Sequence, residues 1–373
     1  MAGKPSSPVA VFPIIVLAIN VLGLLCVAEN QARSPKNFSK WVASNVASFK
    51  ERMAQIENVT RVALDERLAG AEAQRRVIKV RQDGTGDFRT ISDAVKSIPL
   101  GNSRRVVVHI GPGVYKEKVT VEKSKPFVTF LGDPNAMPTI TFDDTAAKFG
   151  TWLSASVAVD SHYFMAANII FKNAAPKPAA GAQSQAVAMR ISGDKAAFYN
   201  CRFYGYQDTL LDDKGRHFFK DCYIEGSVDF IFGSGRSLYR NCEIRSVSDY
   251  PGQTAIVAQG KSSKGDKSGF VFLDCHVTGM GDVYLSRAWR EYSRVVFAYS
   301  YFDTVVNPEG WNDKGFTERD KTVFYGEYKC EGPGANTNRR VDYVKLLTDA
   351  QAKPFLDESF IRGRTWILPP PTL

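Results

Sequence analysis

The chain has 373 residues, an ordinary charged fraction of 23% and a net charge of +9 at pH 7, and it is long enough to bury one large core. The positive balance favours a polyanionic partner, either a nucleic acid or an acidic polysaccharide, although a merely soluble basic protein would carry the same charge. Because Lys and Arg are dispersed and no nucleic-acid-binding motif accompanies them, the sequence argues against a nucleic-acid partner.

Residues 1–28 have the pattern of a secretory signal peptide. Lys4 supplies the positive start, and residues 9–27 are almost wholly apolar and end in small residues suited to cleavage. A signal anchor is the alternative reading, but Pro13 and the modest length of the apolar run favour cleavage. No other segment is long and apolar enough to span a bilayer, so we expect a secreted, extracellular protein with no membrane attachment after signal removal.

Residues 29–76 predict a helical N-terminal extension. Apolar residues recur there at helical spacing, namely Val42, Val46, Phe49, Met53, Ile56, Val59 and Ala63. We expect this extension to cap one end of the domain that follows. Asn37 and Asn58 each begin an N-glycosylation sequon, which an exported protein can use or leave unmodified.

Residues 77–368 predict one domain of short strands, followed by a tail at 369–373. One short helix is expected at 90–98, where apolar residues share a face. Strands are expected early in the domain at 77–80, 105–110, 127–131, 139–142, 156–159 and 167–171. The aromatic-rich segment 354–368 should pack along the outside of the domain.

A repeated phrase in the middle of the domain predicts how these strands are arranged. Its copies are centred on Cys201, Cys222, Cys242 and Cys275, at successive steps of 21, 20 and 33 residues. A fixed period of about this length is typical of a solenoid in which each repeat forms one coil. Since each copy alternates polar and apolar residues as a strand does, we predict an all-β fold, a right-handed parallel β-helix.

This register has a consequence for two acidic residues. Asp208 lies seven residues after Cys201, and Asp229 lies seven residues after Cys222. In stacked coils about 4.8 Å apart the two carboxylates would face each other, so the pKa of one of them should rise. Such a pair can supply a nucleophile and a proton donor, although Asp is also a common turn residue after strands.

Two further rows follow from the same period. Asn or Asp recurs one residue before each repeated cysteine and at the matching earlier position, as Asn168, Asn200, Asp221, Asn241 and Asp274, which predicts an internal polar ladder at the turns. The cysteines stack too, so the register would allow a Cys201–Cys222 disulfide, with a ladder of free thiols as the alternative. The four His are scattered and no Cys–His metal spacing occurs, so we expect no metal and no cofactor.

Six segments together carry a family resemblance. They are Gly113-Val114-Tyr115-Lys116-Glu117, Gln185-Ala186-Val187-Ala188, Gln207-Asp208-Thr209, Val228-Asp229-Phe230-Ile231-Phe232-Gly233, Arg287-Ala288-Trp289 and Gly310-Trp311. In this order and spacing they resemble the signature segments of the plant pectin methylesterases (pectinesterases). The resemblance covers residues 77–368. The N-terminal extension is too short for the inhibitor-like helical bundle that many members carry, so we assign no such domain.

The resemblance implies a role for each polar residue of the site. Asp229 would be the nucleophile and Asp208 the general acid and base. Gln185 and Gln207 would donate hydrogen bonds to the developing oxyanion, and Arg287 would hold Asp229 ionised and aimed. The substrate would be methyl-esterified galacturonan (pectin), with methanol as a product and no cofactor required.

The resemblance also implies a set of aromatic contacts and one covalent link. The side chains expected against the sugar rings are Trp152, Phe232, Trp289 and Trp311, any of which could instead belong to the core. By the same resemblance we favour a disulfide between Cys242 and Cys275. We expect a monomer in the cell wall that a proteinaceous pectinesterase inhibitor can bind.

The chain departs from the family pattern at several cleft positions. The usual Leu-Gly-Arg-Pro-Trp is here Leu-Ser286-Arg287-Ala288-Trp, Leu211 replaces a frequent Tyr, and Ser234-Gly235 replaces Asn-Ala. These changes leave the polar set intact but put subsite preference and rate in doubt. Two alternatives therefore stay open: a catalytically weak, pectin-binding β-helix, and a β-helix pectate lyase that would use a calcium cluster and a basic proton abstractor.

Overall fold

The computed structural model describes residues 38–42, 63–177, 185–250 and 253–372. Contacts divide the chain into two units, residues 1–57 and 58–373. In the first unit residues 38–42 are helical, and Phe38 stacks on Trp41 with ring centroids 5.6 Å apart. The expected signal peptide, the asparagines of both sequons and most of the helical extension lie outside the described residues. Among the described helices, none combines the length and the apolar character needed to cross a bilayer.

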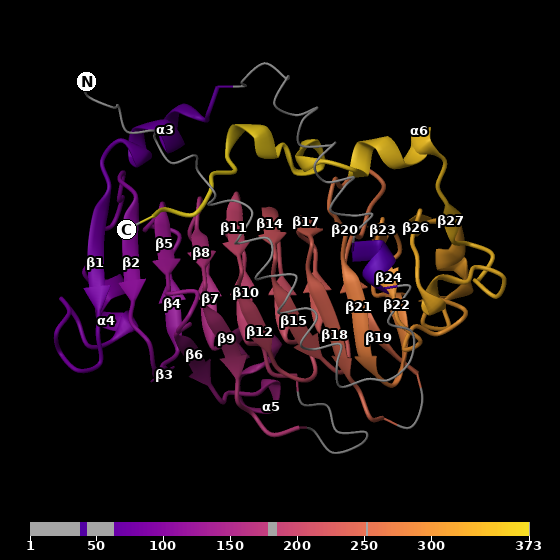
Figure 1. Cartoon of the computed structure of the whole chain (residues 1–373), viewed down its shortest axis with the longest axis horizontal. Coiled ribbons are helices and arrows are strands. Elements are labelled where there is room, and N and C mark those ends of the chain that lie inside the picture. The colour runs from indigo at the N-terminus through magenta and orange to yellow at the C-terminus, as the bar shows by residue number, and fades with distance from the viewer. Residues whose placement is uncertain (1–37, 43–62, 178–184, 251–252, 373) are drawn as a thin grey trace, which may run out of the picture. The chain divides into compact units, whose positions relative to one another are not determined.

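The second unit contains three long parallel sheets, which we call sheets A, B and C (Figure 1). Sheet A has eleven strands, in the order β1 (Arg76–Val80), β2 (Val106–Ile110), β5 (Val128–Leu131), β8 (Met165–Ala167), β11 (Ala196–Tyr199), β14 (Arg216–Lys220), β17 (Arg236–Arg240), β20 (Gly269–Leu273), β23 (Arg294–Ala298), β26 (Phe324–Tyr328) and β27 (Lys345–Leu346). Every pairing in it is parallel, so each strand is reached by a full coil of the chain.

Sheets B and C have eight strands each. Sheet B contains β3 (Val114–Lys116), β6 (Thr139–Phe142), β9 (Ile170–Asn173), β12 (Arg202–Tyr204), β15 (Tyr223–Gly226), β18 (Glu243–Val247), β21 (His276–Met280) and β24 (Tyr301–Phe302). Sheet C contains β4 (Val119–Val121), β7 (Val157–Val159), β10 (Met189–Ile191), β13 (Leu210–Asp212), β16 (Ile231–Gly233), β19 (Gln253–Gln259), β22 (Asp282–Ala288) and β25 (Trp311–Asn312). The chain visits sheets A, B and C in turn, which confirms the predicted right-handed parallel β-helix.

The polar ladder lies where sheet A turns into sheet B. Its five predicted members, Asn168, Asn200, Asp221, Asn241 and Asp274, all adopt left-handed backbone conformations with φ between 46° and 59°. Asn and Asp tolerate this conformation better than other side-chain-bearing residues. Amide groups link successive coils: Asn200 Nδ2 donates to Asn168 Oδ1 at 2.8 Å, and Asn241 Nδ2 donates to Asp221 Oδ1 at 2.6 Å.

The cysteine row packs as small apolar side chains rather than as disulfides. Cys201, Cys222, Cys242, Cys275 and Cys330 are all free thiols, so the disulfide predicted between Cys242 and Cys275 is wrong for this structure. The thiols point into the core and bond to backbone carbonyls: Cys275 Sγ, for example, donates to the Tyr239 carbonyl at 3.5 Å. Burial raises the pKa of the Cys242 and Cys275 thiols, which keeps them protonated and unreactive.

Aromatic rings stack through the core with the period of the coils. Successive centroids along Phe198, Phe219, Tyr239, Phe272 and Phe297 lie 4.7, 4.5, 4.6 and 4.4 Å apart, and the rings are nearly parallel. These spacings follow the separation of neighbouring parallel strands, about 4.8 Å. The row therefore fixes the alignment of one coil on the next.

Short helices close the N-terminal end of the solenoid. Helix α4 (Ile91–Lys96) matches the predicted helix, and the Glu117 carboxylate accepts from its first backbone N–H groups, those of Ile91 at 3.0 Å and Ser92 at 2.9 Å. Helix α3 (Glu66–Glu72) buries Leu68 against sheet A, and its Glu72 pairs with Arg105 at 2.7 Å. Glu117 thus has a structural role at the start of α4.

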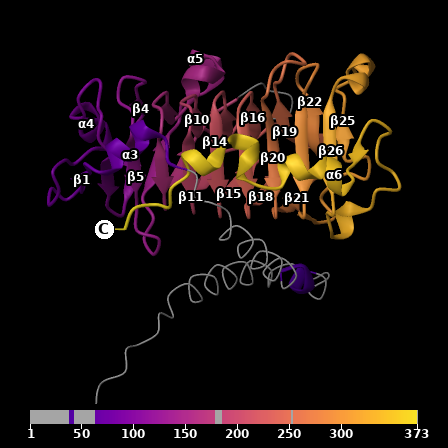
Figure 2. The same cartoon turned by 90° about the horizontal axis from the view of Figure 1, so that it is seen from above.

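The C-terminal segment covers the outer face of sheet A, as predicted. It runs across successive strands as short helical turns in Figure 2: α6 (Asp349–Ala352), η4 (Lys353–Phe355), η5 (Glu358–Ile361) and η6 (Gly363–Thr365). Phe355, Phe360 and Trp366 are buried there beside outward-facing residues of sheet A. Elsewhere, α5 (Ala146–Phe149) and η1 (Thr151–Ser154) lie between β6 and β7, while η2 (Thr317–Lys321) and η3 (Pro333–Ala335) flank β26.

Removing one ring from the aromatic row should destabilise the whole solenoid. Phe219 is fully buried between Phe198 and Tyr239, so Phe219→Ala leaves a cavity and should lower the free energy of unfolding by about 3–5 kcal/mol. Denaturant unfolding measures the change. Phe149→Ala is the matched control, because Phe149 is 43% exposed, and it should cost less than about 0.5 kcal/mol. Equal losses in the two variants would contradict the role of the row.

Candidate active site

A cleft lies on the outer face of sheet C. Its floor is one row across neighbouring strands: Leu211 pairs with Phe232, Phe232 with Ala258, and Ala258 with Arg287. The cavity has a volume of about 370 Å³ and is lined by Thr151, Trp152, Gln185, Gln207, Asp208, Leu211, Asp213, Asp229, Phe232, Ala258, Arg287 and Trp289. All five polar residues singled out from the sequence therefore line a single cleft.

The two predicted carboxylates stand on adjacent coils at equivalent positions. Gln207 pairs with Val228 and Leu210 pairs with Ile231, so Asp208 and Asp229 are in register. The strand spacing puts their backbones about 4.8 Å apart. Asp249 and Asp282, which also lie seven residues after a cysteine, do not line the cleft, so the spacing by itself overpredicts.

Both aspartates are held in left-handed backbone conformations. Their φ angles are 64° for Asp208 and 48° for Asp229. The bend is fixed from both sides: the Asp208 N–H donates to the Val228 carbonyl at 3.0 Å, and the next residue, Thr209, donates its hydroxyl to the Glu225 carbonyl at 2.9 Å. Asp tolerates this conformation better than most residues, and here it recurs at equivalent places on two facing coils.

Arg287 binds only one of the two carboxylates. Its Nε donates to Asp229 Oδ1 at 2.5 Å, and its Nη2 donates to Asp229 Oδ2, forming a bidentate pair. The guanidinium reaches Asp229 from β22, two strands away, because the intervening residue of the row is the small Ala258. Burial alone would lower the pKa of Arg287, but the hydrogen bonds and charge of Asp229 outweigh burial and raise it.

Because Arg287 binds only Asp229, Asp208 has no cationic partner for its carboxyl group in the part of the chain that the structure describes. Asp208 is 8% exposed and no hydrogen bond to its carboxylate is present among the described residues. Burial and then the negative charge of Asp229 raise the pKa of Asp208 well above its ordinary value, and Arg287 offsets this only in part. The site therefore pairs a carboxylate fixed by a guanidinium with a neighbour that keeps its proton, the combination that nucleophilic and acid catalysis requires.

Gln185 and Gln207 bring two side-chain amides to the same cleft. Gln207 directly precedes Asp208, and Gln185 lies at the start of the preceding coil. Within the described part of the chain, neither side-chain amide takes part in a hydrogen bond, so both N–H₂ groups are available to a ligand. A neutral amide can stabilise negative charge without competing for the carboxylate of Asp229.

Three of the four predicted aromatic contacts line the cleft. Phe232 and Trp289 meet edge to face, with centroids 6.1 Å apart, and form one wall. Trp152 is 42% exposed and forms the other, with the Arg190 guanidinium 4.1 Å from its ring centroid. Aromatic side chains that line a cleft suit the apolar faces of sugar rings.

Trp311 is the exception, and its assignment as a substrate contact is wrong. It is completely buried, stacks on Tyr325 at 4.6 Å and donates from Nε1 to Glu327 Oε1 at 2.9 Å. Trp311 pairs with the inward-facing Ser286, whereas Asn312 pairs with Arg287 on the cleft side. Strand alternation thus turns Trp311 into the core, and its neighbour Asn312 occupies the outward position.

Asp213 is a cleft residue that the sequence patterns missed. It follows β13 immediately and lines the cavity with Leu211, and burial raises the pKa of its carboxyl group. A third acid near the reacting pair would disfavour a charged ligand group at that point. The sequence could have indicated Asp213 only through its position one coil after Ser192, and that position is not part of the repeated cysteine phrases.

The cleft and the rest of the described residues lack a cluster suited to a metal ion. Among the described residues, no three His, Cys, Asp or Glu side chains come together as metal ligands would. Of the cleft carboxylates, that of Asp229 is engaged with Arg287.

Comparison with known proteins places these features in a family. The family model described as Pectinesterase matches residues 77–364. The Arabidopsis thaliana protein named Probable pectinesterase 50 is 48% identical over 346 residues, covering 92% of each chain, and Pectinesterase 1 of Olea europaea is 43% identical over 359 residues, covering 95% of this chain and 96% of its own. The solved structure of pectin methylesterase from carrot superposes with a TM-score of 0.73 at 35% identity, covering 78% of this chain and 94% of its own.

Replacing the buried acid should stabilise the protein in a pH-dependent way. A folded-state pKa above the unfolded value of about 3.9 destabilises the fold as pH rises, because the unfolded chain loses its proton first. Asp208→Asn removes this effect, so its melting temperature should exceed that of the wild type by more at pH 7 than at pH 4. Each unit of pKa elevation corresponds to about 1.4 kcal/mol. Calorimetry at both pH values measures the difference, and a gap that shrinks towards pH 7 would contradict the burial argument.

Proposed function

This chain belongs to the pectinesterase family of carboxylic ester hydrolases, and from that premise we propose how its cleft removes methyl groups from pectin with release of methanol. The observation that carries the proposal is the in-register pair Asp208 and Asp229, of which only Asp229 binds Arg287. One acid is thereby suited to attack and the other to donate a proton.

In the first half of the reaction, an oxygen of the Asp229 carboxylate attacks the carbonyl carbon of the methyl ester. Arg287 keeps that carboxylate ionised and oriented. The carbonyl oxygen becomes negatively charged, and the free amides of Gln185 and Gln207 donate hydrogen bonds to it. The tetrahedral intermediate collapses as the bond to the methoxy oxygen breaks, and Asp208 protonates that oxygen, so methanol leaves.

In the second half, water hydrolyses the acyl-enzyme. Asp208, now ionised, takes a proton from the water, whose oxygen attacks the same carbonyl carbon. The bond to Asp229 breaks, which restores its carboxylate, and the product is a galacturonate carboxylic acid that ionises. The raised pKa of Asp208 suits both tasks, since the group must hold a proton at rest and regain one in each cycle.

The walls of the cleft would determine which stretch of pectin binds. Trp152, Phe232 and Trp289 supply apolar contacts to sugar rings. Leu211 leaves the floor apolar where many relatives have a hydroxyl, and Asp213 adds an acid beside it. Both features favour a neutral, esterified sugar over a charged one at this part of the cleft.

The proposal extends to where the enzyme acts and how it is modified and inhibited. The protein is exported by its N-terminal signal to the cell wall, where it acts as a monomer, carries N-glycans at Asn37 and Asn58, and is open to a proteinaceous inhibitor. The sequence pattern of residues 1–28 and the two sequons support export. The exposed cleft on sheet C supplies the surface that an inhibitor would cover.

Two alternatives fit the architecture less well. A pectate lyase needs a calcium cluster, and the described residues hold no group of three potential ligands. A binding protein without turnover would have no need of a buried carboxyl group with a raised pKa beside a carboxylate held by Arg287. Methanol release distinguishes the esterase from both, since a lyase would produce unsaturated sugars that absorb ultraviolet light.

Removing the nucleophile should abolish methanol release. We expect Asp229→Asn to lower kcat by about 10⁴-fold or more on esterified pectin, because an amide cannot form the acyl-enzyme. A coupled methanol assay on purified protein measures it. The matched control is Asp249→Asn, since Asp249 also lies seven residues after a cysteine but pairs with Lys177 away from the cleft, and it should keep nearly full activity. Activity retained by folded Asp229→Asn would remove Asp229 from the mechanism.

The pH profile should report the proton on Asp208. Turnover needs a proton on Asp208, so kcat should fall as pH passes the raised pKa of Asp208. Above that value kcat should drop about tenfold per pH unit. Initial rates of methanol release between about pH 4 and pH 9, corrected for ester hydrolysis without enzyme, test this. A rate that is still climbing at the alkaline end would rule out Asp208 as the proton donor.

A further inference from the structure

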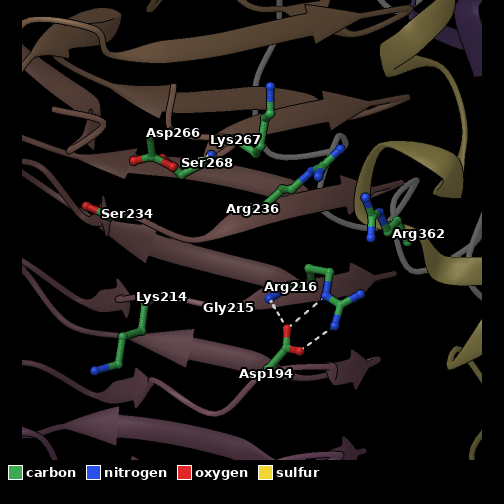
Figure 3. A pocket seen from close by; sticks show the side chains of 10 residues that line it. All are labelled: Asp194, Lys214, Gly215, Arg216, Ser234, Arg236, Asp266, Lys267, Ser268 and Arg362. Atoms are coloured by element: carbon green, nitrogen blue, oxygen red, sulfur yellow. Dashed lines mark hydrogen bonds and ion pairs between the residues drawn. The ribbon is translucent and has the colours of Figure 1, made fainter. Parts of the chain in front are cut away.

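A second hollow lies where sheet C passes into sheet A, on the coils that also form the cleft. Figure 3 shows the side chains that line it, and its volume is about 590 Å³. It is lined by Asp194, Lys214, Gly215, Arg216, Ser234, Arg236, Asp266, Lys267, Ser268 and Arg362. We call this hollow the basic groove, because five of these side chains are cationic and only two are acidic. Neither the repeated phrases nor the proposed chemistry accounts for it.

The two acids of the basic groove are already engaged. The Asp194 carboxylate accepts from Arg216, with Nε at 2.9 Å and Nη2 at 2.5 Å. Asp266 accepts from the N–H of Ser268 at 2.8 Å and from its hydroxyl at 2.9 Å. The charge of Arg216 is therefore neutralised locally, while the remaining cations of the groove keep theirs.

Four cations remain without a counterion. Lys214, Arg236, Lys267 and Arg362 form no ion pair with any described residue. Arg236 is half-buried, its Nε has no hydrogen-bond partner, and its guanidinium lies 5.0 Å from the Phe360 ring centroid. Burial and then the charges of Arg362, Arg294 and Arg216 lower the pKa of Arg236. An anion in the groove would relieve this repulsion.

The cations are spaced by the coils themselves. Lys214, Ser234 and Lys267 each lie two residues before the start of β14, β17 and β20, so they form one row, and Arg216 and Arg236 are direct partners in the next row. Neighbours in a row are about 4.8 Å apart. Gly269 continues the second row without a side chain; at its φ of 153° a Cβ would lie 2.8 Å from the side chain of Arg294. The array is linear, which matches a polymer with repeated charges better than a single small anion.

The basic groove adjoins the cleft. Lys214 follows the cleft residue Asp213, and Ser234 lies two residues beyond the cleft residue Phe232. Gly260 joins the two sites: its carbonyl accepts from the Ser234 hydroxyl at 3.0 Å, and a Cβ on it would lie 3.0 Å from the ring of Trp289. From Leu211 to Lys214 the chain advances by only about 10 Å. One extended polysaccharide can therefore contact both sites.

From these observations we propose that the basic groove binds the carboxylates of galacturonate units that have already lost their methyl groups. The inference rests on the proposed function, because the product of that reaction is the ligand of the groove. The cleft turns neutral esters into anions, and the groove beside it holds those anions. The enzyme thus stays on one chain and removes methyl groups from neighbouring units in blocks.

Binding to fully de-esterified polygalacturonate tests the groove apart from the chemistry. We expect Lys214→Gln, Arg236→Gln and Arg362→Gln, combined in an Asp229→Asn background, to weaken binding about tenfold or more and to reduce its dependence on salt. The control combines Lys79→Gln, Lys123→Gln and Lys353→Gln, three exposed lysines outside the groove, and should change affinity less than about twofold. Equal weakening in both triple variants would overturn the proposal, since net charge alone would then explain binding.

A second variant tests the groove without changing any buried residue. Lys214→Glu with Lys267→Glu changes only exposed lysines, and it should also weaken binding to polygalacturonate while its melting temperature stays at the wild-type value. Inorganic phosphate at matched ionic strength is the competitor. A short oligogalacturonate should displace polygalacturonate more effectively than phosphate does. If phosphate displaces it equally well, the groove is a small-anion site and the polymer assignment is overturned.

Methanol release and the pattern of free carboxylates test the groove separately from the chemistry of the cleft. In the active background, the groove variants should release methanol from a short, fully esterified oligogalacturonate at the wild-type rate, yet leave randomly placed rather than blockwise free carboxylates on long pectin. An unchanged block pattern would overturn the proposal. If the wild type releases no methanol but the groove variants still lose binding to polygalacturonate, the proposed function fails while the anion site stands.

Discussion

The parallel register between successive coils is the constraint on which the rest of this structure depends. Backbone hydrogen bonds between β13 and β16 fix it, and the stacked rings of Phe198, Phe219 and Tyr239 reinforce it from within. A shift of one residue between these coils would turn every side chain of a strand to the opposite face. Asp208 would then lose its neighbour, Arg287 would lose Asp229, and the cationic rows of the basic groove would break apart.

The reactivity of the site depends on a difference in surroundings between two aspartates. Asp208 and Asp229 share a backbone conformation and a place on the coil, but a single guanidinium two strands away contacts only one of them. Because Ala258 is small, Arg287 can lie across the floor of the cleft. Burial then acts on the acid that lacks a cation and raises the pKa of Asp208.

The same register places the cleft and the basic groove on one set of coils. The outer face of sheet C is apolar and carries the reacting acids, and the turn that follows it carries cations in a row. A solenoid extends a binding surface by repeating it, so a polymer is its natural ligand. Neutral and anionic parts of one polysaccharide would meet the two surfaces that suit them.

The sequence alone determined the features that repeat or that match a family motif. The period of the cysteine phrases predicted the coils, the seven-residue offset predicted the facing acids, and the recurrence of Asn or Asp before each cysteine predicted the polar ladder. Tertiary structure decided on which face of a sheet each side chain lies. Trp311 turned out to be a core residue because strand parity points it inward, and Cys242 and Cys275 stayed thiols because they point into the core beside backbone carbonyls. The basic groove could not be foreseen either, since Lys214, Arg236 and Arg362 are far apart in the sequence and only coil stacking and the returning C-terminal segment bring them together.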